Sequence, residues 1–154
     1  MGIDRDTALA LRIPPVTAQI ERGRLRFFAD ATGQTDPVYS DVTAALEAGH
    51  TDLPVPPTFL FGLELEAADP FGYLRDLGVD LRQVLHGEQR FSYDTVLHAG
   101  DTVTLQPRIT DVATRKNGAL QILVKETTVL RDGEPVAQMQ TVVLVREPKA
   151  GACS

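Results

Sequence analysis

One stretch decides the fold of this chain: TFLFGLELEAA, residues 58–68. The preceding LPVPP, residues 53–57, cannot be helical, because proline lacks a backbone donor and restricts the residue before it. From Thr58 to Ala68 the spacing predicts a helix whose apolar side chains cover two faces, with only Glu64 and Glu66 between them. A helix that is apolar on most sides is buried on most sides. The rest of the chain must therefore fold around it.

The second half of the chain predicts a sheet that can cover this helix. Apolar residues recur with a period of two from Val84 onward, and strands are expected at 84–94, 102–112, 119–130 and 136–145. Asn117-Gly118 and Asp132-Gly133 are strong hairpin signals, so the strands should form an antiparallel meander. Sheets and helices bury their apolar faces against each other. We therefore expect an α+β protein with the hot-dog fold, an antiparallel sheet wrapped around a central apolar helix.

Shorter helices are expected at 21–32, closed by Gly33, at 42–48, capped by Asp41, and at 71–77. No internal repeat or linker interrupts the chain, and 154 residues suit one domain. We predict a single domain over residues 1–154, in which residues 147–154 form a flexible tail.

Composition and charge exclude several classes of function. Fifteen basic against 21 acidic residues give a net charge of −6, which argues against a nucleic-acid surface. A single cysteine, Cys153, excludes a thiolate-rich metal site, and three scattered histidines argue against a histidine-built one, so no metal and no cofactor are expected. The acidic N-terminus is unlike a signal peptide, and no run of about 18 apolar residues could span a membrane. A cytoplasmic protein is the expectation.

His86-Gly87-Glu88-Gln89 offers candidate chemistry on a strand. Residues two apart on a strand project to the same face, so His86 and Glu88 could share a pocket wall as an acid–base pair. The alternative is a polar strand face exposed to water or to a partner subunit. His50 and His98 are expected to be solvated loop residues.

A resemblance to a known family enters at the loop GQTDPVYSD, residues 33–41. It resembles the hydration loop of MaoC-like (R)-specific enoyl-thioester hydratases and dehydratases, which reads Gly-Asp-x-Asn-Pro-x-His-x-Asp. The helix FFADATG at 27–33, PPTF at 56–59 and HGEQ at 86–89 also resemble the N-terminal-type, fatty-acid-synthase-like dehydratase domain. The similarity runs from about residue 13 to residue 146.

The departures from this loop concern its acid–base residues. In the family, an Asp and a His hold the water that adds to the enoyl thioester; here Gln34 and Tyr39 stand at those positions, and Asp36 replaces the Asn. Gln cannot act as a base, and an ordinary Tyr is a poor one at neutral pH. The expected hydro-lyase therefore lacks the usual pair, and the candidate catalytic residues are His86, Glu88, Asp36 and Tyr39.

Three functions remain open. The first is a MaoC-like dehydratase or hydratase acting on enoyl or 3-hydroxyacyl thioesters in acyl-CoA or fatty-acid metabolism. The second is a non-catalytic partner subunit that shapes the acyl channel of an intact hydratase. The third is a hot-dog acyl-CoA thioesterase, which would use a carboxylate such as Asp36 or Glu64.

The resemblance also implies a substrate site and partners. The thioester carbonyl would sit at the start of the central helix, where free N–H groups stabilise an enolate-like oxygen. The implied substrate-binding residues are Thr58, Phe59, Leu60, Phe61 and Leu63. Phe59, Phe61 and Leu63 would line an acyl channel, and the alternative is that these three belong to the hydrophobic core. The expected partners are an acyl thioester of coenzyme A or acyl-carrier protein, and a second subunit in a homodimer or in a heterodimer with an intact MaoC-like chain. Neither nucleic acid nor a membrane is expected.

Overall fold

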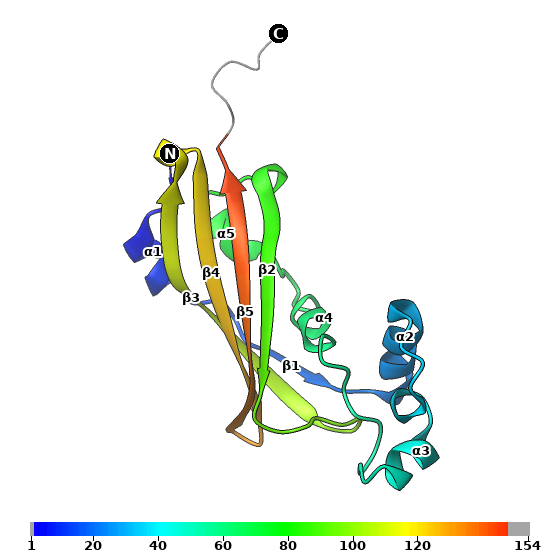
Figure 1. Cartoon of the computed structure of the whole chain (residues 1–154). Coiled ribbons are helices and arrows are strands. Elements are labelled where there is room, and N and C mark those ends of the chain that lie inside the picture. The colour runs from blue at the N-terminus through cyan, green and yellow to red at the C-terminus, as the bar shows by residue number, and fades with distance from the viewer. Residues whose placement is uncertain (1, 148–154) are drawn as a thin grey trace.

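A computed structural model describes residues 2–147 as a curled five-stranded antiparallel sheet with helices packed on its concave side (Figure 1). The strand order across the sheet is β1-β3-β4-β5-β2. The strands are β1 Val16–Gln19, β2 Val84–Tyr93, β3 Thr102–Arg115, β4 Leu120–Arg131 and β5 Glu134–Arg146. The helices are α1 Arg5–Ala10, α2 Arg22–Thr32, α3 Val42–Glu47, α4 Leu60–Glu64 and α5 Gly72–Asp76, with single 3₁₀ turns at Pro37–Tyr39, Leu81–Gln83 and Lys116–Gly118.

The predicted hairpins form where turn residues tolerate a left-handed backbone. Asn117 connects β3 to β4 with φ 54°, and Asp132 and Gly133 connect β4 to β5 with φ 53° and 80°. Asn, Asp and Gly adopt this region at little steric cost. The predicted meander is confirmed for β3, β4 and β5. It is wrong for β2, which pairs with β5 at the edge of the sheet, while β1 takes the place beside β3.

The core lies between α4 and the concave face of the sheet. Leu60 and Leu63 of α4 are fully buried in one cluster with Leu105, Val129 and Met139 from three strands. A second cluster joins Tyr73 and Leu74 of α5 to side chains of β3, β4 and β5. A sheet wrapped around a buried helix is the hot-dog fold, as the sequence predicted.

The central helix is shorter than predicted. It runs from Leu60 to Glu64, and residues 65–70 continue as turns instead of reaching Ala68. Glu66 forms an ion pair with Arg24 of α2, and Pro70 disfavours helical backbone at the residue before it. These interactions direct the chain away from the helix axis.

Two elements were not predicted at all. Helix α1 is capped by Asp4, whose carboxylate accepts a hydrogen bond of 2.8 Å from the backbone N–H of Thr7. Strand β1 has four residues, too few for a clear alternation, and it exists through its pairing with β3. At the other end, the Glu147 N–H donates to the carbonyl of Ala119, and the rest of the predicted tail, residues 148–154, lies outside the described residues.

Candidate active site

The loop that resembles the hydration motif is held by its own side chains. Gly33 ends α2 with φ 70°. The Asp36 carboxylate accepts from the Val38 N–H at 3.1 Å, and the Gln34 side-chain oxygen accepts from the Asp36 N–H at 3.1 Å. Asp36 is exposed and caps the 3₁₀ turn that carries Tyr39. Its carboxylate is therefore engaged in forming the loop.

Tyr39 lines a cavity beside this loop. The cavity has a volume of about 400 Å³ and is bounded by Tyr39, His50, Pro57 and Tyr93 among others. The Tyr93 hydroxyl donates to the Pro57 carbonyl, and burial raises the pKa of Tyr93 to about 12. Tyr93 therefore stays protonated at neutral pH, and the imidazole of His50 lines the same cavity.

His50 and His98 are not the solvated loop residues that the sequence suggested. Both are half-buried, and His50 Nδ1 lies 3.1 Å from His98 Nε2. Asp101 accepts from the His98 backbone N–H at 3.0 Å and pairs with Arg131 at 2.9 Å. Burial, and then the neighbouring His50, lower the pKa of His98. This contact joins segments 48 residues apart, which no local pattern could indicate.

The prediction that His86 and Glu88 share a face is wrong. Strand β2 has a bulge at Gly87, because His86 pairs with Val143 of β5 whereas Glu88 pairs with the adjacent Val142. Opposed residues project to one face, and consecutive residues project to opposite faces. His86 therefore faces the concave side with buried Val143, and Glu88 faces the outer side.

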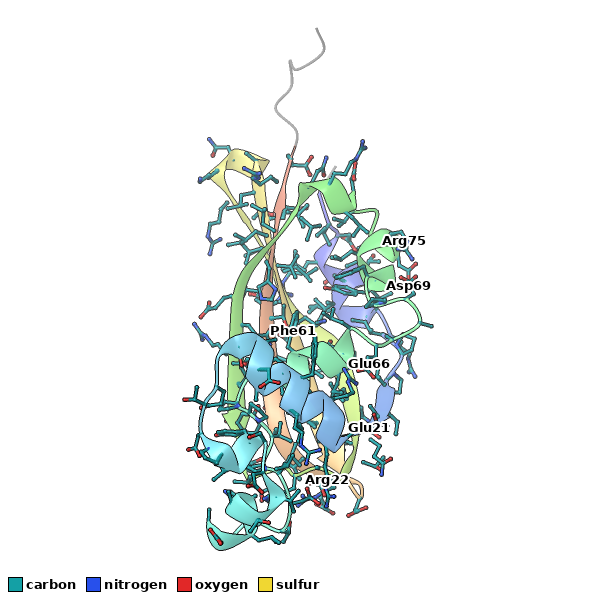
Figure 2. All side chains as sticks on the ribbon, turned by 90° about the vertical axis from the view of Figure 1, so that its right-hand side faces the viewer. Glu21, Arg22, Phe61, Glu66, Asp69 and Arg75 are labelled. Atoms are coloured by element: carbon teal, nitrogen blue, oxygen red, sulfur yellow. The ribbon has the colours of Figure 1, made fainter. Side chains whose placement is uncertain are left out.

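The bulge also separates the two side chains chemically. Glu88 forms an ion pair of 2.6 Å with Arg90 of the same strand. His86 packs edge-on against Phe61 of α4, with ring centroids 5.3 Å apart, and both line a cavity of about 80 Å³. Phe61 is labelled in Figure 2. The sequence located the His correctly in a cavity wall but assigned it the wrong carboxylate.

The five implied substrate-binding residues divide into three kinds. Phe59, Leu60 and Leu63 are buried in the core cluster, and the ring of Phe59 stacks edge-on against Phe28 at 5.4 Å. Thr58 is exposed. Phe61 is half-buried and reaches a cavity, so it is the residue of this set that the geometry favours for contact with a ligand.

A buried ion pair joins α4 to β4, and the sequence did not predict it. Glu64 Oε1 lies 2.6 Å from Lys125 Nζ, and each side chain is 7% exposed. Thr127 Oγ1 donates to the same oxygen at 3.1 Å, and Lys125 Nζ lies 5.0 Å from the Tyr73 ring centroid. Burial, followed by the Glu64 charge, raises the pKa of Tyr73. The available signal was a Lys in the middle of an apolar strand and a Glu on an apolar helix, but the sequence does not indicate that Lys125 pairs with Glu64 rather than with Glu66.

Two other kinds of site were searched for in the described part of the chain. No group of three or more His, Cys, Asp or Glu side chains within residues 2–147 could hold a metal ion. Among the helices described, none is long and apolar enough to cross a bilayer.

Sequence comparison places the chain in a family. A family model described as "FAS1-like, dehydratase domain region" matches residues 8–139. This chain belongs to that family. The FAS1-like dehydratase region found here also has close full-length relatives: the UPF0336 protein of Thermobifida fusca (strain YX) is 36% identical over 146 residues, 95% of each chain. The UPF0336 protein of Saccharopolyspora erythraea is 33% identical over 135 residues, 86% of this chain and 85% of the relative.

Solved structures confirm the hot-dog fold of this FAS1-like dehydratase region. A chain of the HadBC (3R-hydroxyacyl-ACP dehydratase) complex from Mycobacterium tuberculosis superposes with a TM-score of 0.74 at 25% identity, covering 86% of this chain and 92% of that one. A chain of the ChsH1-ChsH2 complex from the same organism gives a TM-score of 0.77 at 21% identity, with 95% of each chain covered. The MaoC-like dehydratase from Rhodospirillum rubrum gives 0.66 at 19% identity, covering 93% and 96%. The resemblance predicted from the sequence is confirmed.

Proposed function

We propose that this chain is the acyl-binding subunit of a heteromeric hydro-lyase that interconverts 3-hydroxyacyl and enoyl thioesters, and that a partner subunit supplies proton transfer. One observation carries the proposal. The two places where the sequence predicts acid–base residues are both disrupted: Gln34 and Tyr39 occupy the family's Asp and His positions, and the Gly87 bulge turns His86 and Glu88 to opposite faces. A general base and the group that orients it must lie within hydrogen-bond reach of each other.

The edge of the sheet supports a second subunit. Strand β2 is ten residues long and lies at one edge of the described sheet. It pairs with β5 on one side, and no strand of the described residues pairs with its other side. A long outer strand presents a row of backbone donors and acceptors that a strand from another chain can pair with. The similar HadBC and ChsH1-ChsH2 structures are both complexes, which favours a heteromer over a homodimer.

The proposed substrate is an acyl thioester of coenzyme A or acyl-carrier protein. Phe61 and His86 line a cavity that borders the β2 edge, so a ligand held there would lie next to the added subunit. As part of the same proposal, we infer that the protein acts in the cytoplasm and in fatty-acid metabolism.

The test is a hydration assay on the full chain with and without a MaoC-like subunit that retains the Asp and His loop residues. We expect no turnover of crotonyl-CoA by the chain alone, turnover by the co-expressed pair, and a heteromer in light scattering. Sustained turnover by the chain alone, at a rate unaffected by the partner, would overturn the proposal.

A stand-alone hydratase is the second candidate, favoured by one observation. His86 and Glu64 line the same cavity, so one cavity offers both an imidazole and a carboxyl group, although not the predicted Glu88. On this alternative His86→Ala lowers turnover of the chain alone by about 10²- to 10⁴-fold, and Tyr39→Phe lowers it far less. On the proposal above, His86→Ala alters the cavity wall and so raises KM for the heteromer, but it causes no such loss in kcat, because the partner moves the proton.

A further inference from the structure

The buried Glu64–Lys125 pair leaves one carboxylate oxygen without a partner. Lys125 Nζ and Thr127 Oγ1 both bind Glu64 Oε1, at 2.6 Å and 3.1 Å. Glu64 Oε2 is buried and has no hydrogen-bond partner in the described part of the chain. An unpaired buried acceptor is costly, so a native protein retains one where a further donor arrives.

Two cavities share the Glu64 side chain in their walls. One has a volume of about 370 Å³ and the other about 80 Å³, and Glu64, Pro70, Tyr73 and Lys125 line both. Together they form a crevice between the concave face of the sheet and the α4–α5 segment. The smaller cavity reaches Phe61 and His86 near the β2 edge, so Glu64 lies inward of them.

The chemistry of the walls restricts what can fill the crevice. Ile13, Val16, Ala67 and Pro107 make the larger cavity mainly apolar. The ion pair is neutral as a whole, so a charged group gains little: an ammonium would meet Lys125, and a carboxylate would meet Oε2. A plain alkyl chain would fill the crevice but leave Oε2 without any hydrogen-bond donor, from the ligand or from water. A neutral hydroxyl group satisfies Oε2 and leaves the apolar walls to the carbon chain.

We propose that Glu64 Oε2 is a hydrogen-bond acceptor for a hydroxyl group on the acyl chain, so that this crevice selects hydroxylated over plain alkyl thioesters. The proposal rests on the function proposed above, which makes an acyl thioester the ligand. If the thioester lies at the start of the central helix, Glu64 is about 6 Å further along α4 at roughly 1.5 Å per residue. The hydroxyl therefore lies several carbon atoms beyond the thioester, distinct from the 3-hydroxyl group that reacts.

The test compares two probes that differ in one atom. Hexanoyl-pantetheine and 6-hydroxyhexanoyl-pantetheine are titrated calorimetrically into the full chain and into its complex with a partner. We expect the hydroxylated probe to bind at least about tenfold tighter, the value of one buried hydrogen bond. Glu64→Leu/Lys125→Met removes the acceptor and the cation together and should abolish the preference. Glu126→Gln is the matched control, because Glu126 lies on the same strand with its carboxylate on the outer face, paired with Arg108.

The outcomes separate the two proposals. Equal affinities for both probes, or a preference retained in the double variant, overturn the role of Glu64 and leave the thioester assignment intact. Binding of neither probe to the chain or the complex overturns both. Circular dichroism on each variant shows that it is folded before its affinity is compared.

Discussion

Replacing Lys125 by Met should destabilise this protein strongly, whereas replacing both members of the buried pair should not. Lys125→Met keeps the length of the side chain and its packing over Tyr73, but leaves the Glu64 carboxylate 93% buried with Thr127 as its remaining donor. Removing one partner of a buried ion pair typically costs about 3–5 kcal/mol. For a chain of this size that corresponds to a fall of about 6–20 °C in Tm. Glu64→Leu alone should cost a similar amount, since Lys125 is then the buried unpaired charge.

The double variant Glu64→Leu/Lys125→Met fills the same space with apolar atoms, and such replacements are often neutral or stabilising by about 1–4 kcal/mol. Urea unfolding followed by circular dichroism at one fixed protein concentration measures all four members of the cycle; the chain has no Trp for fluorescence. If the double variant were as unstable as the sum of the two single variants, the pair would not be coupled and this reasoning would fail.

Two further predictions concern the histidine contact and the bulge. Since burial and His50 lower the pKa of His98, the unfolded chain binds the proton first as pH falls, so the free energy of unfolding should decrease as pH drops from above 6.5 through the folded-state pKa. Urea titrations between pH 8 and pH 5 check this, and His98→Asn should flatten the curve; an unchanged slope in that variant would contradict the assignment. Gly87→Ala should destabilise the protein by about 1–3 kcal/mol, because the added Cβ would lie 3.0 Å from Leu144 Cγ and 3.2 Å from the Val142 carbonyl oxygen. Gly62→Ala is the comparison, as its Cβ would meet nothing within 4 Å, and equal losses in the two variants would argue against a steric role for Gly87.

The features that the sequence predicted correctly depend on local chemistry. Asn117-Gly118 and Asp132-Gly133 define hairpins through the backbone freedom of the turn residues themselves, and alternating apolar residues define the long strands. The apolar coat of residues 58–68 indicated a buried segment, and Leu60 and Leu63 are indeed at the centre of the core. The predicted length of the central helix was wrong. Glu66 pairs with Arg24 of α2, a contact between distant parts of the chain that the local pattern could not indicate.

The candidate site was harder to predict because each of its features depends on the partner strand or on a distant segment. A bulge shifts the alternation by one residue, and nothing in His86-Gly87-Glu88 distinguishes a bulged strand from a regular one until the register with β5 is known. The His50–His98 contact and the Glu64–Lys125 pair join residues 48 and 61 positions apart. Periodicity assigned each of these residues to an element, but could not indicate which elements would bring them together.

The position of β2 connects assembly to ligand binding thermodynamically. Val84 and His86 belong both to the outer strand of the sheet and to the wall of the cavity that leads to Glu64. A ligand that fills this cavity and also contacts a strand added at β2 would be held by two chains at once. By linkage, such a ligand tightens the association of the subunits by the same factor by which the added subunit raises the affinity for the ligand. Subunit dissociation measured with and without ligand would then report the same coupling free energy as a binding titration.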